Sequence, residues 1–166
     1  MKEFANLRDE SGLPVKLDEE LYVGWPEVVP VIDAKENDKS GFFMYYSTMT
    51  KADKVKALGY AISKDGFRWE PRGICLRPDP GTMDGAGVAR CTVIRNAIYD
   101  KEKSQWEDSS GYTMFYEGVS EEDNKHRIMK AESADGKTWK KMGVIFDVGE
   151  VGAWDSDGVG SPNVLR

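Results

Sequence analysis

Short runs in which apolar and polar residues alternate recur along almost the whole chain. Aromatic and β-branched residues fill these runs, and Gly, Asp, Asn and Ser separate them. This pattern is typical of half-buried β-strands joined by tight turns. We therefore expect an all-β protein with eight strands, over residues 27–33, 41–48, 56–64, 67–76, 87–95, 112–119, 126–134 and 137–146.

One hairpin motif occurs twice. SKDGFRWE and SADGKTWK lie 133 − 63 = 70 residues apart. Asp65-Gly66 and Asp135-Gly136 are signals for tight turns between antiparallel strands, because such turns require positive φ angles. Trp69 and Trp139 follow these turns at the same offset. We expect the two tryptophans to be buried at equivalent positions.

The repeat extends beyond the hairpin, which favours a repetitive architecture. FMYYS matches TMFYE and PRGICL matches KMGVIF at offset 70, while MDGAGVARCTVIR matches WDSDGVGSPNVLR at offset 71. Four antiparallel strands in each repeat describe a β-propeller of four-stranded antiparallel blades. The expected organisation is an N-terminal arm over residues 1–24 and a partial propeller domain over 25–166, with units 25–82 and 83–153 and the start of a third unit at 154–166.

The sequences FFMYYS, YAISKDGFRWE and WDSDGVGSPNVLR resemble five-bladed propellers of the arabinanase, levansucrase and invertase superfamily, glycoside hydrolase families 43 and 32 and their relatives. The resemblance covers about residues 25–166. The hairpin motif also resembles a shortened sialidase Asp-box, which is a structural turn of propellers with many functions. About two blades and the inner strand of a third are present.

Chain length adds an expectation about assembly. Five blades need on the order of 300 residues, and the chain has 166. The apolar run 159–165 would be an unpaired strand edge, which is prone to association. We expect this edge to pair either with missing blades of the same chain or with a second copy.

Composition excludes several classes of partner. Lys and Arg number 23 against 29 Asp and Glu, a net charge of −6, and no block of like charge occurs, so nucleic acid is not an expected partner. No apolar run is long enough to span a membrane, and the N-terminus lacks a secretory signal. The chain is expected to be soluble, and the family resemblance implies a saccharide as its ligand.

No cofactor or metal is expected. Cys75 and Cys91 lie in apolar flanks without metal-ligand spacing and are interpreted as buried free thiols. The single histidine, His126, is expected at a strand entrance without a role. The Asp155–Gly158 stretch resembles the start of a calcium loop, but Arg166 occupies the position where the bidentate glutamate is needed.

The family resemblance implies catalytic acids near the starts of the inner strands, because one carboxyl group protonates the leaving oxygen while another attacks or activates water. The positions that match the acid of the family are interpreted as Val29, Arg90 and Ser161. None is acidic. We therefore expect this chain alone to be inactive, and we hold hydrolysis as an expectation for a full-length protein.

Other acidic residues are candidates for a reorganised site. In an antiparallel blade, the start of the inner strand and the end of the second strand lie at the same edge of the sheet. The tentative catalytic residues are expected at this edge, and they are Asp157, Glu117, Asp84 and Glu27. The alternative interpretation is structural, with Asp155 and Asp157 capping a turn and Glu117 and Glu27 as solvated strand ends.

Candidate substrate-binding residues lie at the entrances of the inner strands. Arg90 lies near the expected axis and needs an acidic partner, for which Asp84 or Asp157 is expected, or a ligand oxygen. Exposed aromatic faces stack on sugar rings, so Trp25 and Trp154 are candidates, with packing between blades as the alternative. Ser161 completes the set.

Three functional hypotheses remain open from the sequence. The first is a glycoside hydrolase-like propeller that acts on an arabinose-, xylose- or fructose-containing saccharide. The second is a non-catalytic carbohydrate-binding or assembly module that has lost the catalytic acids. A sialidase-like or generic interaction propeller is a third possibility, and it would have no acidic funnel.

Overall fold

The computed structural model describes residues 20–32, 39–51 and 54–165 of the chain, and every regular element in them is a β-strand. None of these residues belongs to a helix that could cross a membrane. The strands are β1 (Glu20–Ile32), β2 (Lys39–Thr50), β3 (Lys56–Ser63), β4 (Glu70–Leu76), β5 (Gly87–Asp100), β6 (Gln105–Val119), β7 (His126–Ser133) and β8 (Lys140–Phe146).

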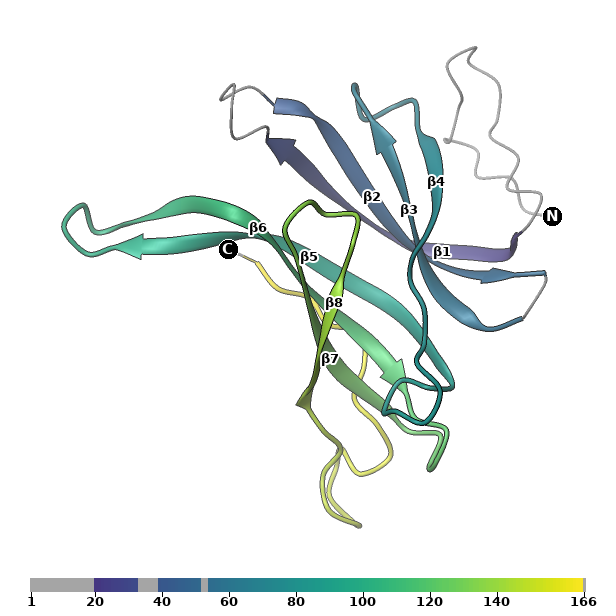
Figure 1. Ribbon diagram of the computed structural model, residues 1–166. Helices are drawn as coiled ribbons and strands as arrows, with labels where there is room; N and C mark the ends of the chain where they lie inside the picture. Colours follow the sequence, from purple (N-terminus) through teal and green to yellow (C-terminus); the bar gives the residue numbers. More distant parts are fainter. Residues whose placement is uncertain (1–19, 33–38, 52–53, 166) are drawn as a thin grey trace.

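The strands form two four-stranded antiparallel units, β1–β4 and β5–β8 (Figure 1). A short parallel contact between β3 and β5, at Lys56 and Gly87, joins the units into one sheet that is not closed. The prediction of an all-β protein built from four-stranded antiparallel units is therefore confirmed.

The main hydrophobic core lies between the two units. Phe43 of β2 packs edge-on against Tyr112 of β6, with ring centroids 6.0 Å apart. The hydroxyl of Tyr45, which is fully buried, donates a hydrogen bond of 2.6 Å to the carbonyl of Gly136 in the second unit. Leu58, Val88, Met114 and Tyr116 join the same core. Because one core serves both units, neither unit is independent.

The two repeated hairpin turns use the same hydrogen bonds. In the first, Ser63 Oγ accepts hydrogen bonds from the N–H groups of Asp65 and Gly66, and Asp65 Oδ1 accepts from the next two N–H groups. The second turn repeats all four bonds around Ser133 and Asp135. Gly66 and Gly136 both have positive φ, 76° and 72°. The prediction of equivalent tight turns is confirmed.

The tryptophans after these turns occupy equivalent positions along the chain but pack in different clusters, so the prediction that both are buried is confirmed for Trp69 only. Trp69 is buried against Tyr46 and Ala61. Trp139 is partly buried and packs edge-on against Tyr45 of the first unit, with centroids 5.6 Å apart. The second tryptophan therefore contributes to packing between the units.

The connection over residues 99–111 lies outside the predicted strands 87–95 and 112–119, but most of it is strand in the structure. β5 and β6 continue pairing out to Asp100 and Gln105, and the turn between them is short. The hairpin extends as a long ribbon away from the rest of the sheet (Figure 1). Tyr99 and Trp106 stabilise it as a cross-strand aromatic pair with centroids 5.4 Å apart.

The predicted strand over residues 159–165 is not a strand in the structure. Positive φ angles at Gly158 (151°) and Ser161 (55°) bend the backbone. The segment is attached to the sheet through a hydrogen bond of 3.0 Å from Val159 N to the carbonyl of His126. Alternation of apolar residues does not produce a strand where no described strand lies alongside to pair with it.

Candidate functional site

Three non-glycine residues take left-handed backbone conformations at the starts of three repeats. Their φ angles are 47° for Trp25, 40° for Arg90 and 55° for Ser161. The register of β1 shifts around Trp25 and that of β5 shifts around Arg90, as expected of β-bulges. Such backbone strain in a bulky residue persists where the surrounding structure holds it, and functional sites often contain it.

These bulges correct the register of the first repeat. Val29 is buried and pairs regularly with Phe43, so it does not occupy the position that matches Arg90. Trp25 does, at an offset of 90 − 25 = 65 residues. The shared pattern of Trp-Pro-Glu-Val and Ser-Pro-Asn-Val in the sequence could have revealed this register, because both place a proline directly after the bulge residue.

The bulges at Arg90 and Ser161 each direct a backbone N–H toward the preceding unit. The N–H of Arg90 donates to Ser47 Oγ at 2.8 Å, and the N–H of Ser161 donates to Glu117 Oε2 at 3.0 Å. Ser47 and Glu117 occupy equivalent positions in the repeat, 70 residues apart. The second strand of each unit therefore supplies the acceptor that holds the next bulge.

The three bulge residues are close to one another. The guanidinium carbon of Arg90 lies 4.5 Å from the centroid of the Trp25 ring, a cation–π contact. Arg90 Nη1 lies 3.4 Å from Ser161 Oγ. Trp25 remains 54% exposed. Together with Glu117 and His126, these residues form what we call the axial cluster.

Glu117 is the buried centre of the axial cluster. Its side chain is only 2% exposed and accepts hydrogen bonds from Arg90 Nη1 at 3.1 Å, His126 Nδ1 at 2.7 Å and the Ser161 N–H. The interpretation of Glu117 as a solvated strand end is wrong, because protein donors replace water around the carboxylate. The expected partners of Arg90, Asp84 or Asp157, are replaced by Glu117.

His126, for which the sequence predicted no role, belongs to this cluster. It lies at the first position of β7, as predicted, and its ring is 39% exposed. Val119 pairs with His126 and Glu117 pairs with Ile128, so Glu117 and His126 are diagonal neighbours on one face of the hairpin. The strand pattern and the short loop between β6 and β7 could have shown from the sequence that these two side chains share a face.

Two glycines allow the terminal segment to lie on the cluster. A Cβ atom at Gly160 would collide with Glu117 Oε2, and one at Gly158 would fall 3.4 Å from the backbone of His126. Gly158 also has a φ of 151°, which side chains disfavour. The sequence Gly-Val-Gly-Ser thus brings the Ser161 N–H to the buried carboxylate.

Asp84 lies elsewhere, on the opposite face of β6. Its carboxylate accepts hydrogen bonds from Tyr116 Oη at 2.9 Å and Thr82 Oγ1 at 2.8 Å, and it pairs with Lys141 Nζ at 2.7 Å. Burial by itself raises the pKa of Asp84, but the hydrogen bonds, that from Lys141 first, outweigh it and leave the pKa below its usual value. Side chains of Tyr116 and Glu117 alternate across the strand, which separates the two acids.

The remaining predicted residues occupy different surroundings. Glu27 is partly buried, and its Oε1 accepts hydrogen bonds from Thr92 Oγ1 at 3.1 Å and from the N–H of Val93 at 3.4 Å. Asp157 is exposed in the loop after β8, and Trp154 in the same loop is 89% exposed. The structure therefore brings Trp25, Arg90, Glu117 and Ser161 together and leaves Asp84 on the other side of β6.

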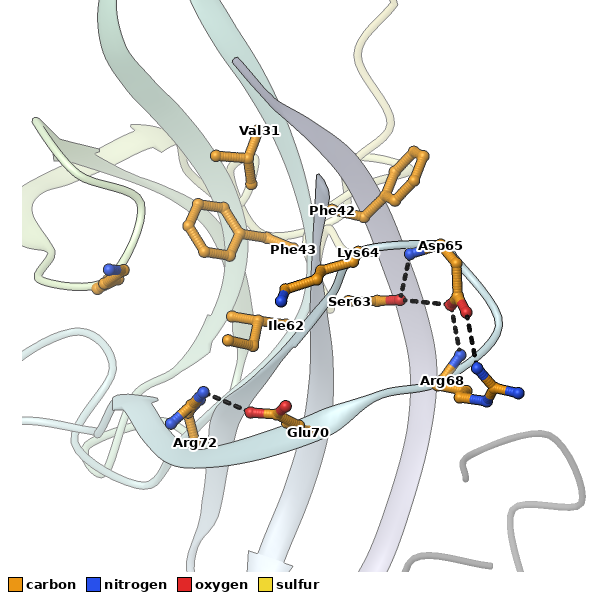
Figure 2. A pocket seen from close by; sticks show the side chains of 11 residues that line it. Val31, Phe42, Phe43, Ile62, Ser63, Lys64, Asp65, Arg68, Glu70 and Arg72 are labelled. Carbon is orange, nitrogen blue, oxygen red and sulfur yellow. Dashed lines mark hydrogen bonds and ion pairs between the residues drawn. The ribbon is translucent and has the colours of Figure 1, made fainter. Parts of the chain in front are cut away.

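A separate cavity of about 650 Å³ lies at the hairpin end of the first unit (Figure 2). Phe43 and Ile62 form part of its apolar floor, and charged side chains surround it. Two of its arginines pair with acids of the same hairpin: Arg72 with Glu70 at 2.5 Å and Arg68 with Asp65 at 3.8 Å. These local pairs offset much of the charge, and the axial cluster, with its strained backbone and buried carboxylate, is the stronger candidate site.

The chemistry available at the axial cluster is binding and proton transfer. It offers an exposed aromatic face, a guanidinium, an imidazole and a hydroxyl group around one buried carboxylate. In the part of the chain that the structure describes, no three His, Cys, Asp or Glu side chains group in a way that could hold a metal ion.

No protein-family model and no curated protein matches the chain. Among solved structures, the chain is similar to a family 117 glycoside hydrolase produced by the marine bacterium Zobellia galactanivorans. The TM-score is 0.64 at 16% sequence identity, over 95% of this chain and 48% of that chain. It is also similar to an exo-β-1,3-galactanase from Phanerochaete chrysosporium, crystallised with galactose, with a TM-score of 0.48 and 20% identity over 84% of this chain and 29% of that chain.

The first likeness shows the fold of the chain. The two four-stranded units belong to a propeller-type fold like that of a glycoside hydrolase, as the sequence predicted, although the sheet is not closed here. The chain spans about half the length of that enzyme, 48% of its residues.

Proposed function

We propose that this chain forms the saccharide-binding floor of a glycoside hydrolase-like propeller protein. In this proposal, Trp25 stacks on a sugar ring, Arg90 and Ser161 bind sugar oxygens, and the axial cluster is the centre of the site. Arabinose-, xylose- or fructose-containing saccharides are candidate ligands from the family resemblance.

The contact between Arg90 and Trp25 is the observation that supports this proposal most directly. An exposed tryptophan stacks on the apolar face of a sugar, and the guanidinium beside it supplies several hydrogen-bond donors in a fixed plane. Both residues are held in left-handed bulges, which fix the direction of their side chains. A binding site gains affinity from such preorganisation.

Hydrolysis is the second candidate, and the pairing of Glu117 with His126 favours it. A buried carboxylate that accepts a hydrogen bond from Nδ1 of a partly exposed imidazole orients the ring and leaves Nε2 to exchange a proton with a bound substrate. Glu117 itself is shielded by its three donors. Asp157 and Glu27 remain candidates for a second carboxylate, and residues of a longer protein can contribute others.

Binding is tested by isothermal titration calorimetry of the purified protein with arabinan, xylan, fructan and galactan oligosaccharides. Saturable binding of one of them, lost in Trp25→Ala, is the expected result. Trp106→Ala is the matched control, because Trp106 is a comparably exposed tryptophan, 60% exposed, on the distant β5–β6 ribbon. Unchanged affinity in Trp25→Ala would exclude the proposed site.

Hydrolysis is tested on the same panel by reducing-sugar release. Loss of turnover in both Glu117→Gln and His126→Gln, with the melting temperature retained, supports an acid–base role for the pair. Asp157→Asn tests whether that exposed carboxyl takes part. Binding without turnover in the wild type leaves the binding proposal intact and removes the enzymatic one.

A further inference from the structure

We infer that the axial cluster takes an anionic sugar residue, either a uronate or a sulfated sugar, and that Arg90 is the residue that selects it. This inference rests on the proposed saccharide-binding function and specifies its ligand class. Such selectivity depends on which charged groups of the cluster are exposed and which are withdrawn from solvent.

Three of the four acidic residues predicted for the site are withdrawn from solvent or lie away from the cluster, and the fourth, Asp157, is exposed in the loop after β8. Glu117 is 2% exposed and bonded by three donors. Glu27 accepts hydrogen bonds from Thr92 and Val93. Asp84 lies on the opposite face of β6 with Lys141. These three acids therefore present little negative charge to an incoming ligand.

The donor groups of the cluster are accessible instead. The Arg90 side chain is 34% exposed, and its hydrogen bonds to described residues all use Nη1. A guanidinium has five N–H groups in one plane, and the edge formed by Nε and Nη2 can donate to two oxygens of one acidic group. This planar pair of donors matches a carboxylate or a sulfate better than a single hydroxyl.

Trp25 and His126 complete the recognition surface. Trp25 supports the guanidinium plane from one side at 4.5 Å and is itself exposed enough to contact a sugar ring. His126 bonds to the same Glu117 carboxylate, with its ring partly exposed. One buried carboxylate thus faces one permanent cation and one imidazole, and both of these side chains are partly exposed.

The net charge of −6 makes the inference specific to this site. A protein of that charge does not attract anions generally. Preference for an anionic saccharide must therefore come from a local arrangement, and the exposed edge of Arg90 is the arrangement that the cluster provides.

The experiment compares three ligands of equal length by calorimetry with the purified protein. The probes are galactotriose, trigalacturonic acid and a sulfated galactotriose, because galactose and galacturonate share one ring stereochemistry and differ in charge. The carboxylate and the sulfate are thus tested in separate arms. We expect at least one charged ligand to bind about tenfold more tightly than the neutral one. Tighter binding of one charged arm alone identifies which acidic group the site accepts.

Substitutions then assign the preference. Arg90→Gln is expected to reduce the preference to less than about twofold, while Arg72→Gln, in an exposed ion pair of the distant hairpin, leaves it unchanged. A wild-type measurement removes dependence on the folding of the variant: between about 0.05 and 0.5 M salt, binding of the charged ligand weakens and that of galactotriose does not.

The outcomes separate the anionic selectivity from the proposed function. Equal affinity for neutral and charged ligands, with Trp25→Ala weakening both, overturns the anionic selectivity and keeps saccharide binding. A preference that survives Arg90→Gln overturns the role of Arg90. Absence of binding for the whole saccharide panel and all three probes overturns both.

Discussion

Arg90 and Glu117 form an ion pair of 3.1 Å in which the arginine reaches water and the glutamate does not, with side chains 34% and 2% exposed. The pair joins the start of β5 to the end of β6 and supports the bulge at Ser161 through the same carboxylate. Its asymmetry determines how the protein responds to the loss of either partner.

Arg90→Ala is expected to destabilise the fold by about 2–3 kcal/mol, because it leaves a buried carboxylate without its cation. Arg72→Ala, which breaks an exposed pair of the same type, is expected to cost less than about 1 kcal/mol. Chemical denaturation followed by tryptophan fluorescence measures both. The double variant Arg90→Ala/Glu117→Ser should recover part of the loss, because serine occupies the equivalent position 47 in the first unit. Additive losses in the double variant would show that the unpaired carboxylate is not the cause.

The two repeated turns predict a dependence of stability on acidity. Hydrogen bonds from backbone N–H groups, that of Arg68 first, lower the pKa of Asp65, and those of Thr138 and Lys137 lower the pKa of Asp135 despite its slight burial. A lowered pKa in the folded state means that the unfolded chain binds more protons. The two carboxylates should therefore contribute fully to the free energy of unfolding above the ordinary Asp pKa of about 3.9. This contribution should be lost as the pH falls below that value.

Asp135→Asn should flatten this acid-side decline, because the substituted residue no longer titrates. Thermal melts between neutral pH and about pH 3 measure the slope. Asp65→Asn, in the equivalent turn of the first unit, should flatten the slope in the same way. Equal slopes for wild type and Asp135→Asn would show that the turn carboxylate does not contribute.

Both cysteines should be unreactive in the folded protein. Burial raises the pKa of Cys75 to about 12 and that of Cys91 well above its usual value, and the thiolate is the reactive form. Neither should react with Ellman's reagent at neutral pH, whereas both should react at once in guanidinium chloride. Rapid native labelling of Cys91, which is buried, would indicate that the core around it opens, whereas labelling of the partly buried Cys75 would show only that its thiol is accessible.

The second buried ion pair predicts a further stability effect. Lys141→Met retains the aliphatic stem but removes the cation from Asp84, and it should cost about 2–3 kcal/mol. Lys130→Met, which breaks a more exposed pair with Glu132, should change stability by less than about 1 kcal/mol. Urea denaturation of both variants tests the difference, and equal losses would show that Asp84 is adequately held by its neutral donors.

Local chemistry made much of the fold predictable from the sequence. The Ser-x-Asp-Gly motif specifies a turn through hydrogen bonds between residues two or three positions apart, so the motif alone is enough to place both hairpins. Period-2 alternation identified the strands, and the offset of 70 residues identified the repeated unit. The turns and the alternation depend on residues close together in the sequence, and the repeat appears when two stretches of the sequence are compared. None of these features requires knowledge of tertiary contacts.

The axial cluster depended on tertiary structure. Glu117 contacts residues 9, 27 and 44 positions away along the chain. Local sequence patterns do not show which of these distant residues will lie next to it. The bulge at Trp25 shifted the first repeat relative to the predicted slot at Val29, and the alternation of side chains across β6 put Asp84 and Glu117 on opposite faces. The sequence by itself determined the strands and turns, because their hydrogen bonds are local. Only the tertiary structure decided which polar side chains meet, because one residue of bulge or register changes the face and the partner of every side chain beyond it.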